Sequence, residues 1–404
     1  MTDVVSLAAE LLAIQSTTGS EGGVVDFISR WLVARGWNVS LQEVTRGRAN
    51  IWASRSGGGS GVTFSTHLDT VPPYVPPRLE GTRLFGRGSS DAKGIAAAMM
   101  VAADRLVGNG EKRVDVLFVV GEEKGSDGAR AANNLSTKSR FLINGEPTES
   151  KLASGAKGSL RATIRTRGRE AHSAYPHLGR SAIEPMLELL PTLRKLPLPA
   201  DPVLGETTVN IGTIKGGTEA NVIPAHAEAE LMFRLVGDVE PIKKSILDWA
   251  KGHADVEFGS HIPAQRFATV PGIEAGPVAY TSDIPLLSNW GEPLLFGPGS
   301  IHVAHTPDEY VDVEELRKSV DTYERLAKTL LSRCRRFLFP ENGKRNGPSQ
   351  CWAPRGPSGK CSCVFSPITR GSRSRNWQLR SVPRARNTVR SLAGSRVRHH
   401  HNQS

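Results

Sequence analysis

Apolar side chains recur at helical spacing near the start of the chain and then give way to short apolar runs. Val4, Leu7 and Leu11 fall on one face of a predicted first helix, which Thr2 or Asp3 can cap. The same patterns predict a second helix at about 21–35 and strands at 37–44, 50–54 and 62–66. Two helices followed by strands are typical of the start of an α/β domain.

The pattern changes twice further along the chain. Buried strands are expected at 114–120, 141–144 and 294–296, and helices at 95–107 and 313–331. Between them lies a stretch with half-exposed strands and amphipathic helices, which indicates a separate α+β domain inserted into the first. Its expected elements are strands at 159–166, 207–214, 228–235 and 255–259 and helices at 181–196 and 239–252. The predicted boundaries are 1–155 and 263–332 for the two parts of the α/β domain, 156–262 for the insert and 333–404 for a tail.

Charge and cysteine separate this tail from the rest. Residues 333–404 carry 14 Arg, 2 Lys and one acid, a net charge of +15, whereas the preceding 332 residues carry a net charge of −4. All four cysteines lie in the tail, so a metal site in the body must use His, Asp and Glu. The tail has no apolar periodicity and is expected to be disordered. It is either an arm attracted to RNA or membrane by its charge or a non-native extension, such as a shifted reading frame.

Nothing in the sequence predicts a membrane protein. There is no apolar run of 18 residues, and the N-terminus lacks a basic segment followed by an apolar one. We therefore expect a cytoplasmic protein without a membrane span.

Several predicted strands of the α/β domain end in residues that can bind metal. His67 and Asp69 follow one strand, Glu122 and Glu123 follow the next, and Glu146 follows the third. The carboxyl ends of strands are where α/β sheets bind ligands. A carboxylate beside His67 can accept its second ring N–H and fix the tautomer, although a lone His-x-Asp is more often a satisfied surface histidine.

Two further segments complete the candidate site. Asp91 precedes the helix at 95–107, where its carboxylate can either cap that helix or bridge two cations. A Gly/Pro loop after the strand at 294–296 contains His302 and His305, and the Thr-Pro-Asp-Glu that follows favours His305. Two equal half-sites for zinc then become possible, His67 with Glu146 and Glu123 with His305, joined by Asp91. Glu122 is left without a metal role and can act as a general base.

These motifs resemble those of the acetylornithine deacetylase and succinyl-diaminopimelate desuccinylase family of dizinc hydrolases, which also contains aminoacylases and carboxypeptidase G. The resemblance covers residues 1–332 and not the tail. It rests on five ordered motifs: His67-Leu68-Asp69-Thr70-Val71-Pro72, Gly86-Arg87-Gly88-Ser89-Ser90-Asp91-Ala92-Lys93-Gly94, Gly121-Glu122-Glu123, Gly145-Glu146-Pro147-Thr148, and Gly297-Pro298-Gly299 through His305. Thr66 stands where the family often has Gly, and Ala92 where many members have Met.

The resemblance implies a zinc-peptidase-like catalytic domain with a mixed, largely parallel sheet and an inserted lid and dimerisation domain. It assigns two Zn²⁺ ions, which Co²⁺ can replace. It makes Glu122 the base and gives Asp69 the task of orienting His67. His172 would reach the active site of a partner subunit and stabilise the oxyanion, and Asn221 and Arg234 would bind the substrate carboxylate. The implied ligands are His67, Asp91 and Glu146 for one ion and Asp91, Glu123 and His305 for the other.

The expected function is hydrolysis of the amide bond of a small N-acyl amino acid by a homodimer. Gly297-Pro298-Gly299 and the acidic Pro307-Asp308-Glu309-Tyr310 favour an acetylornithine deacetylase over a desuccinylase. A dipeptidase or carboxypeptidase with the same metal core is the alternative. A zinc-binding protein without catalysis would lack Glu122 or a ligand, and a nucleic-acid binder would depend on the tail alone.

Overall fold

The computed structural model describes residues 2–55 and 61–338, with side chains placed up to 333. Of the tail predicted for 333–404, residues 339–404 lie outside the described part, and the predictions about them stay predictions. Within the described ranges, no helix combines the length and the apolar character needed to cross a membrane.

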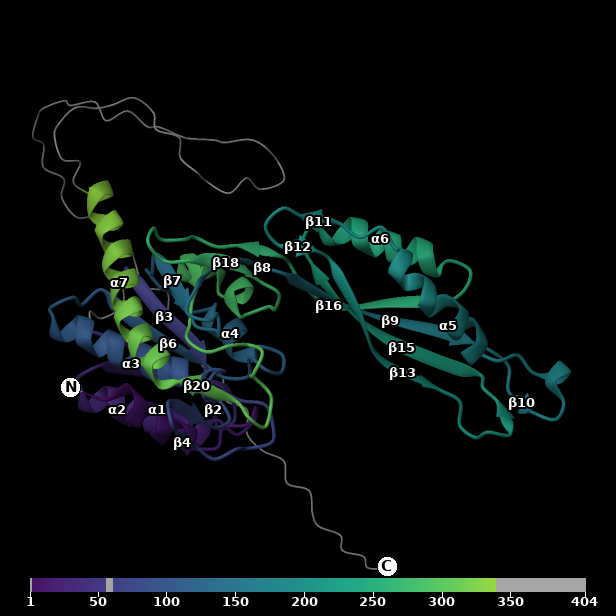
Figure 1. The fold of residues 1–404 in the computed structure, drawn as a ribbon, viewed down its shortest axis with the longest axis horizontal. Helices are drawn as coiled ribbons and strands as arrows, with labels where there is room; N and C mark the ends of the chain where they lie inside the picture. The colour runs from purple at the N-terminus through teal and green to yellow at the C-terminus, as the bar shows by residue number, and fades with distance from the viewer. Residues whose placement is uncertain (1, 56–60, 339–404) are drawn as a thin grey trace, which may run out of the picture. The chain divides into compact units, whose positions relative to one another are not determined.

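A six-stranded mixed sheet forms the centre of the α/β domain (Figure 1). Its four strands β6, β3, β7 and β19 are parallel, and β1 and β2 add an antiparallel edge. The predicted fold class is therefore confirmed. In spatial order the strands are β1 (Asn38–Thr45), β2 (Arg48–Ser54), β6 (Val114–Val119), β3 (Val62–His67), β7 (Phe141–Asn144) and β19 (Glu292–Leu295).

Both faces of this sheet are covered, which explains why its central strands are apolar throughout. Alternate residues of β6 point to opposite faces: Val116 and Phe118 join the main core, and Leu117 and Val119 join a second one. The main core is formed with α1 (Val4–Leu12), α2 (Gly22–Ala34), α3 (Lys93–Gly108) and α7 (Val313–Leu338). The second is formed with α4 (Asp127–Ala132) and the 3-10 helices η3 (Ile284–Leu286) and η4 (Ser288–Trp290).

Two small sheets connect distant parts of this domain. In one, β20 (Tyr310–Asp312) pairs with β5 (Arg83–Phe85), which also pairs with β4 (Arg78–Glu80). In the other, β8 (Leu152–Ala156) lies between β17 (Gln265–Arg266) and β18 (Ala275–Val278). The chain after the insert is thus paired with segments that precede it.

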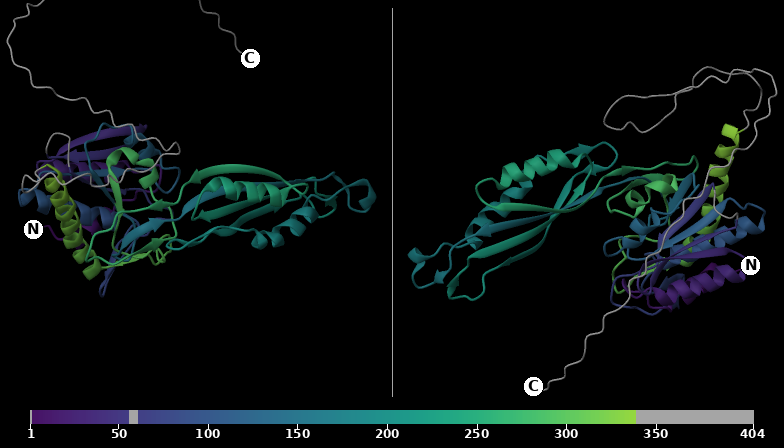
Figure 2. Two further views of the ribbon diagram at one scale, coloured as in Figure 1. Left: turned by 90° about the horizontal axis from the view of Figure 1, so that it is seen from above. Right: turned by 180° about the vertical axis from the view of Figure 1, so that it is seen from behind.

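The insert forms a four-stranded antiparallel sheet in the order β13-β15-β9-β16, with helices on one face (Figures 1 and 2). Residues of α5, α6, β9 and β15 share a separate apolar core. The expected α+β insert is confirmed. Its main elements are β9 (Gly158–Arg167), α5 (Ile183–Leu189), η2 (Leu190–Lys195), β13 (Thr208–Gly216), β15 (His226–Leu235), α6 (Val239–Ala250) and β16 (Asp255–Ile262). Its short elements are β10 (Ala171–His172), η1 (Pro176–Leu178), β11 (Ala200–Asp201), β12 (Gly205–Glu206) and β14 (Val222–Ile223).

Two helices differ from the prediction. The single helix expected at 181–196 is α5 followed by the 3-10 helix η2, because Pro191 lacks the N–H that an α-helix needs at that position. Helix α7 continues to Leu338 instead of ending near 331, so it extends into the predicted tail. The sequence contains no Gly or Pro between its start and Pro340 that would stop it.

Candidate active site

The three neighbouring parallel strands β6, β3 and β7 bring the candidate side chains to one edge of the sheet. His67 is the last residue of β3, and Glu146 follows β7. Gly121 lies between β6 and Glu122 and has a positive φ of 78°, a backbone conformation that residues with a side chain rarely adopt. A Cβ atom added at this position would also lie only 2.0 Å from Asp127 Oδ1. A glycine is therefore needed for the turn that presents Glu122 and Glu123.

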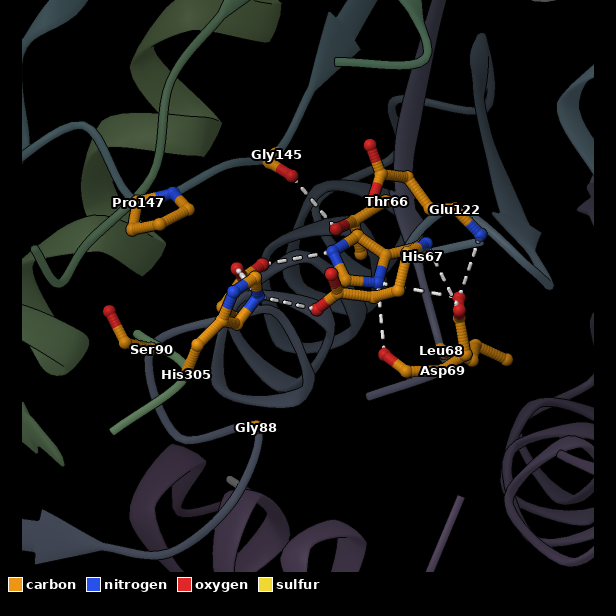
Figure 3. A network of polar contacts seen from close by, with 12 residues as sticks. Thr66, His67, Leu68, Asp69, Gly88, Ser90, Glu122, Gly145, Pro147 and His305 are labelled. Atoms are coloured by element: carbon orange, nitrogen blue, oxygen red, sulfur yellow. Dashed lines mark hydrogen bonds and ion pairs between the residues drawn. The ribbon is translucent and has the colours of Figure 1, made fainter. Parts of the chain in front are cut away.

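His67, Asp91 and Glu146 form a first buried group. Figure 3 shows His67 of this group, with its contacts to Asp69 as dashed lines. The Nε2 atom of His67 lies 2.9 Å from Oδ1 of Asp91, and one potential ligand atom from each residue lies within 4.8 Å of the others. Each of these three residues is at most 5% exposed.

Asp91, Glu123 and His305 form a second group that shares Asp91 with the first. His305 Nε2 lies 2.8 Å from Glu123 Oε1 and 3.4 Å from Asp91 Oδ2. Both histidines that the sequence left as alternatives are exposed, but only His305 lies beside these carboxylates, and His302 belongs to neither group.

The position of Asp91 decides between its two interpretations. The N-cap residue of α3 is Ala92, and no side chain caps this helix. Of the two alternatives, the cap is excluded, because one oxygen of Asp91 faces His67 and the other faces His305.

The donor set fits divalent cations. His67 Nδ1 lies 3.0 Å from the carbonyl oxygen of Asp69, which accepts a hydrogen bond when that nitrogen carries the proton. When the His67 ring is neutral and its proton is on Nδ1, the lone pair of Nε2 faces the carboxylate of Asp91. Both groups are then acceptors, so a proton or a cation must lie between them for the contact to be favourable. Imidazole nitrogen and carboxylate oxygen are ligands that Zn²⁺ and related ions accept.

The charge of the site supports the same conclusion. Burial, followed by neighbouring carboxylates, raises the pKa of Glu122 and of Glu146 well above the usual value. Hydrogen bonds to Asp91 and Glu123 raise the pKa of His305 to about 10. Without further cations, the protein must hold protons here to balance its own carboxylates, and two divalent ions can replace them.

Asp69 contacts more than the histidine it was expected to orient. Its carboxylate lies 3.5 Å from His67 Nδ1, farther than its own carbonyl oxygen. The carboxylate accepts hydrogen bonds from the backbone N–H groups of Glu122 (3.0 Å) and Glu123 (3.2 Å) and from the Thr18 hydroxyl (2.7 Å). Asp69 therefore ties the end of β3 to the turn after β6.

One buried acid at the site was missed in the sequence. Asp283 is 1% exposed, and neither of its carboxylate oxygens makes a hydrogen bond to a described residue, although the Ser126 hydroxyl lies nearby. Burial raises the pKa of Asp283 to about 6, and its charge helps to raise the pKa of Glu122. The only sequence signal was a single acid between Glu274 and Glu292.

The three remaining predicted residues lie in the insert. His172 is exposed on β10, which pairs with β14 beside Asn221, and its ring accepts a hydrogen bond from the Ala174 N–H. Arg234 is half-buried on β15, where burial and then the charge of Arg161 lower its pKa. Within the described part of this single chain, no hydrogen bond or ion pair joins any of the three to the metal-binding groups.

The fold and this cluster define the class of protein: an α/β protein with a candidate two-metal site at its strand ends and an inserted α+β domain. Comparisons with known proteins agree. Residues 154–257 match the model of a peptidase dimerisation domain, and residues 50–182 match that of peptidase family M28.

Curated relatives cover most of the chain. A peptidase M20 domain-containing protein of Schizosaccharomyces pombe is 38% identical over 80% of this chain and 84% of its own length. A probable carboxypeptidase of Aspergillus flavus is 38% identical over 81% of this chain and 87% of its own length. The chain belongs to the M20 family of peptidases.

Solved structures share the fold at lower identity. An M20 family metallo-carboxypeptidase of Sulfolobus solfataricus is 17% identical with a TM-score of 0.66, over 82% of this chain and 99% of that one. A dinuclear metal binding peptidase of Bacillus subtilis is 15% identical with a TM-score of 0.61, over 81% of this chain and 98% of that one. These likenesses agree with the fold, while the curated relatives show the M20 family and the matched model shows the dimerisation domain. The narrower resemblance to acetylornithine deacetylases stays a prediction.

Proposed function

We propose that this chain is a dizinc hydrolase that cleaves an amide bond next to a free carboxylate, as a carboxypeptidase or as a deacylase of N-acyl amino acids. The observation that carries the proposal is the carboxylate of Asp91, whose two oxygens face two separate histidines. A carboxylate shared in this way is typical of two-metal hydrolytic sites.

His67, Asp91 and Glu146 would hold one ion, and Asp91, Glu123 and His305 the other, with Co²⁺ able to replace Zn²⁺. When bound, the two ions supply Lewis-acid polarisation of the amide carbonyl and lower the pKa of water. The protein contributes a preformed ligand set, in which His67, Asp91 and Glu146 are buried and the carbonyl oxygen of Asp69 holds His67 in one orientation.

Glu122 is the general base of this proposal. Its carboxylate makes no hydrogen bond to the described residues, while its backbone N–H is fixed by Asp69. Burial and the nearby Asp283 raise the pKa of Glu122, which suits a group that accepts a proton from the attacking water and returns it to the leaving amine.

The remaining residues act across a homodimer. His172 of one subunit would stabilise the oxyanion in the other, and Asn221 and Arg234 would bind the substrate carboxylate. The exposure of His172 and Asn221 in the single chain and the match to a dimerisation domain support this part of the proposal.

Carboxypeptidase activity is the first candidate, because curated relatives at 34–38% identity carry that name. Acetylornithine deacetylase activity is the second, favoured by the Gly297-Pro298-Gly299 segment and the acidic residues after Pro307. A C-terminal peptide bond and an N-acyl amino acid share the group –CO–NH–CHR–COO⁻. One site can therefore serve either, and the substrate side chains decide between them.

The test is hydrolysis of a panel by the zinc-reconstituted protein. The panel contains N-acetylornithine, N-acetyl-lysine, N-succinyl-diaminopimelate, N-acetylmethionine, a dipeptide and a tripeptide, with the C-terminally amidated tripeptide as a control. We expect turnover only where the carboxylate is free. Cleavage of the amidated peptide would contradict the proposal.

Glu122→Gln is expected to reduce kcat by about 10²–10⁴-fold with zinc still bound, because it removes the proton acceptor and keeps the shape. Glu43→Gln, on the exposed side of β1, is the matched control and should leave kcat unchanged. A Glu122→Gln enzyme with undiminished kcat would exclude Glu122 as the base.

A further inference from the structure

The glutamate that follows the His305 loop is buried beside the segment that carries Asp91. Glu309 is 1% exposed. Its Oε1 accepts hydrogen bonds from three backbone N–H groups, those of Gly88 (2.9 Å), Ser90 (3.1 Å) and Asp91 (3.1 Å). Its Oε2 accepts from Nη1 of Arg87 at 2.6 Å. One carboxylate thus binds four donors from a single loop of the chain, residues 87–91.

Backbone pairing holds Glu309 in this place. Strand β20 begins at Tyr310, directly after Glu309, and pairs with β5, which ends one residue before the loop. The carbonyl oxygen of Glu309 also accepts from the N–H of Gly86 at 3.0 Å. Glu309 lies 218 positions after Asp91 in the sequence, yet both its side chain and its backbone are bonded to the loop that ends at Asp91 or to the residue before it.

The chemistry of the contact requires a carboxylate. Every partner of Glu309 is a donor, and an ionised carboxylate offers acceptors alone. A glutamine would place an NH₂ group against either the three backbone N–H groups or the guanidinium. The charge of Glu309 is neutralised by Arg87, itself 1% exposed, so the buried anion is compensated.

We propose that Glu309 is the positioning residue of the shared metal ligand, and that its contacts to the backbone N–H groups of residues 88–91 set where the Asp91 carboxylate stands. The inference rests on the proposed dizinc function and deepens it. Asp91 is the one residue common to both metal-binding groups. Since metal–ligand distances tolerate only a few tenths of an ångström, a loosened loop would weaken both ions together.

Two other contacts fix side chains in and just after this loop, those of Ser90 and Lys93. The Ser90 hydroxyl donates to the carbonyl oxygen of Ser300 at 3.2 Å, and Lys93 Nζ donates to the carbonyl oxygen of Ile14 at 2.7 Å. Neither contact involves the backbone N–H groups that Glu309 binds. Glu309 alone, among the described side chains, binds the N–H of Asp91.

The experiment compares zinc affinity and the visible spectrum of the Co²⁺-substituted protein in the wild type, Glu309→Gln and Glu309→Asp. Zinc affinity is measured by competition with a chelating dye, at a temperature where circular dichroism shows each variant folded. Leu326→Ala, a truncation in the core of α7, is the control for lost stability without a contact to the loop. We expect Glu309→Gln to weaken zinc binding by about 10–100-fold and to change the Co²⁺ bands, and Leu326→Ala to do neither.

Glu309→Asp keeps the charge but is one methylene shorter, so it should also weaken zinc binding, and it carries the test if Glu309→Gln does not fold. Wild-type zinc affinity and an unchanged Co²⁺ spectrum in a folded Glu309 variant would overturn the inference and leave the proposed function intact. A wild-type protein that binds no zinc would instead overturn the proposed function and the inference with it.

Discussion

Three donors converge on the carboxylate of Asp69, and this explains why the residue matters beyond its histidine. Oδ1 accepts from the N–H of Glu122, and Oδ2 accepts from the N–H of Glu123 and the hydroxyl of Thr18. The base and one metal ligand thus depend on an acid from a different strand.

Asp69→Asn is expected to lower kcat/KM by about 10–100-fold, because the amide turns one acceptor into a donor that faces other donors. Steady-state kinetics with zinc content measured in parallel would check this. Thr18→Val removes only one of the three donors and should have a smaller effect. Equal losses of kcat/KM in the two variants would contradict the role of Asp69 in holding the Glu122–Glu123 turn.

At the residue scale, the sequence predicted the members of the cluster and missed their supports. His67, Glu122, Glu123 and Glu146 were recognisable because each follows an apolar strand. Asp283 and the contacts of Glu309 were not, because they depend on how segments about 150 to 220 residues apart are brought together. Local patterns do not contain that distance information.

At the scale of elements, helices α1 and α2 and the central strands lie within a few residues of their predicted ranges. Their apolar faces have a clear period, and Asp3 caps α1 as expected, accepting from the N–H of Ser6 at 3.0 Å. The predicted ends of α5 and α7 were wrong. Helix α5 ends earlier than predicted, just before Pro191, and α7 continues further than predicted because no proline or glycine interrupts it.

Asp3→Ala should lower the free energy of unfolding by ~1 kcal/mol at pH 7, the usual contribution of an N-cap. The hydrogen bond from the Ser6 side chain lowers the pKa of Asp3 below its usual 3.8. The stabilisation is therefore present above about pH 4 and is lost as pH falls through the lower, folded-state pKa. Urea unfolding of both proteins at several pH values would show whether the difference narrows in acid. A difference that stays constant down to pH 2 would contradict this explanation.

Removal of zinc should lower the unfolding temperature, because the ends of β3, β6 and β7 then hold uncompensated carboxylates. A ligand at about 100 times its dissociation constant stabilises a protein by about 2.7 kcal/mol. Calorimetry with and without a chelator is the measurement, and Zn²⁺ added back should restore the transition. Unchanged unfolding after zinc removal would argue against metal at these strand ends.

At the scale of the whole molecule, the proposed active site needs two subunits. Mixing Glu122→Gln with His172→Ala subunits should restore activity that neither variant has alone. Random pairing makes about half of the dimers heterodimers, and in each of these one of the two sites has both Glu122 and His172. The mixture should therefore reach about a quarter of wild-type activity. Subunits mixed after chemical cross-linking are the control. No recovery from exchanging subunits would show that His172 acts within its own chain or not at all.

The pairing of β20 with β5 also has a consequence for how the protein is made. A ribosome completes residues 62–146, with most of the carboxylates, long before it reaches His305 and Glu309. A nascent chain that stops before position 305 therefore has neither the second histidine nor Glu309, which binds the Asp91 loop. We expect such unfinished chains to take up little zinc, so that loading of the cofactor waits for synthesis of the last part of the catalytic domain.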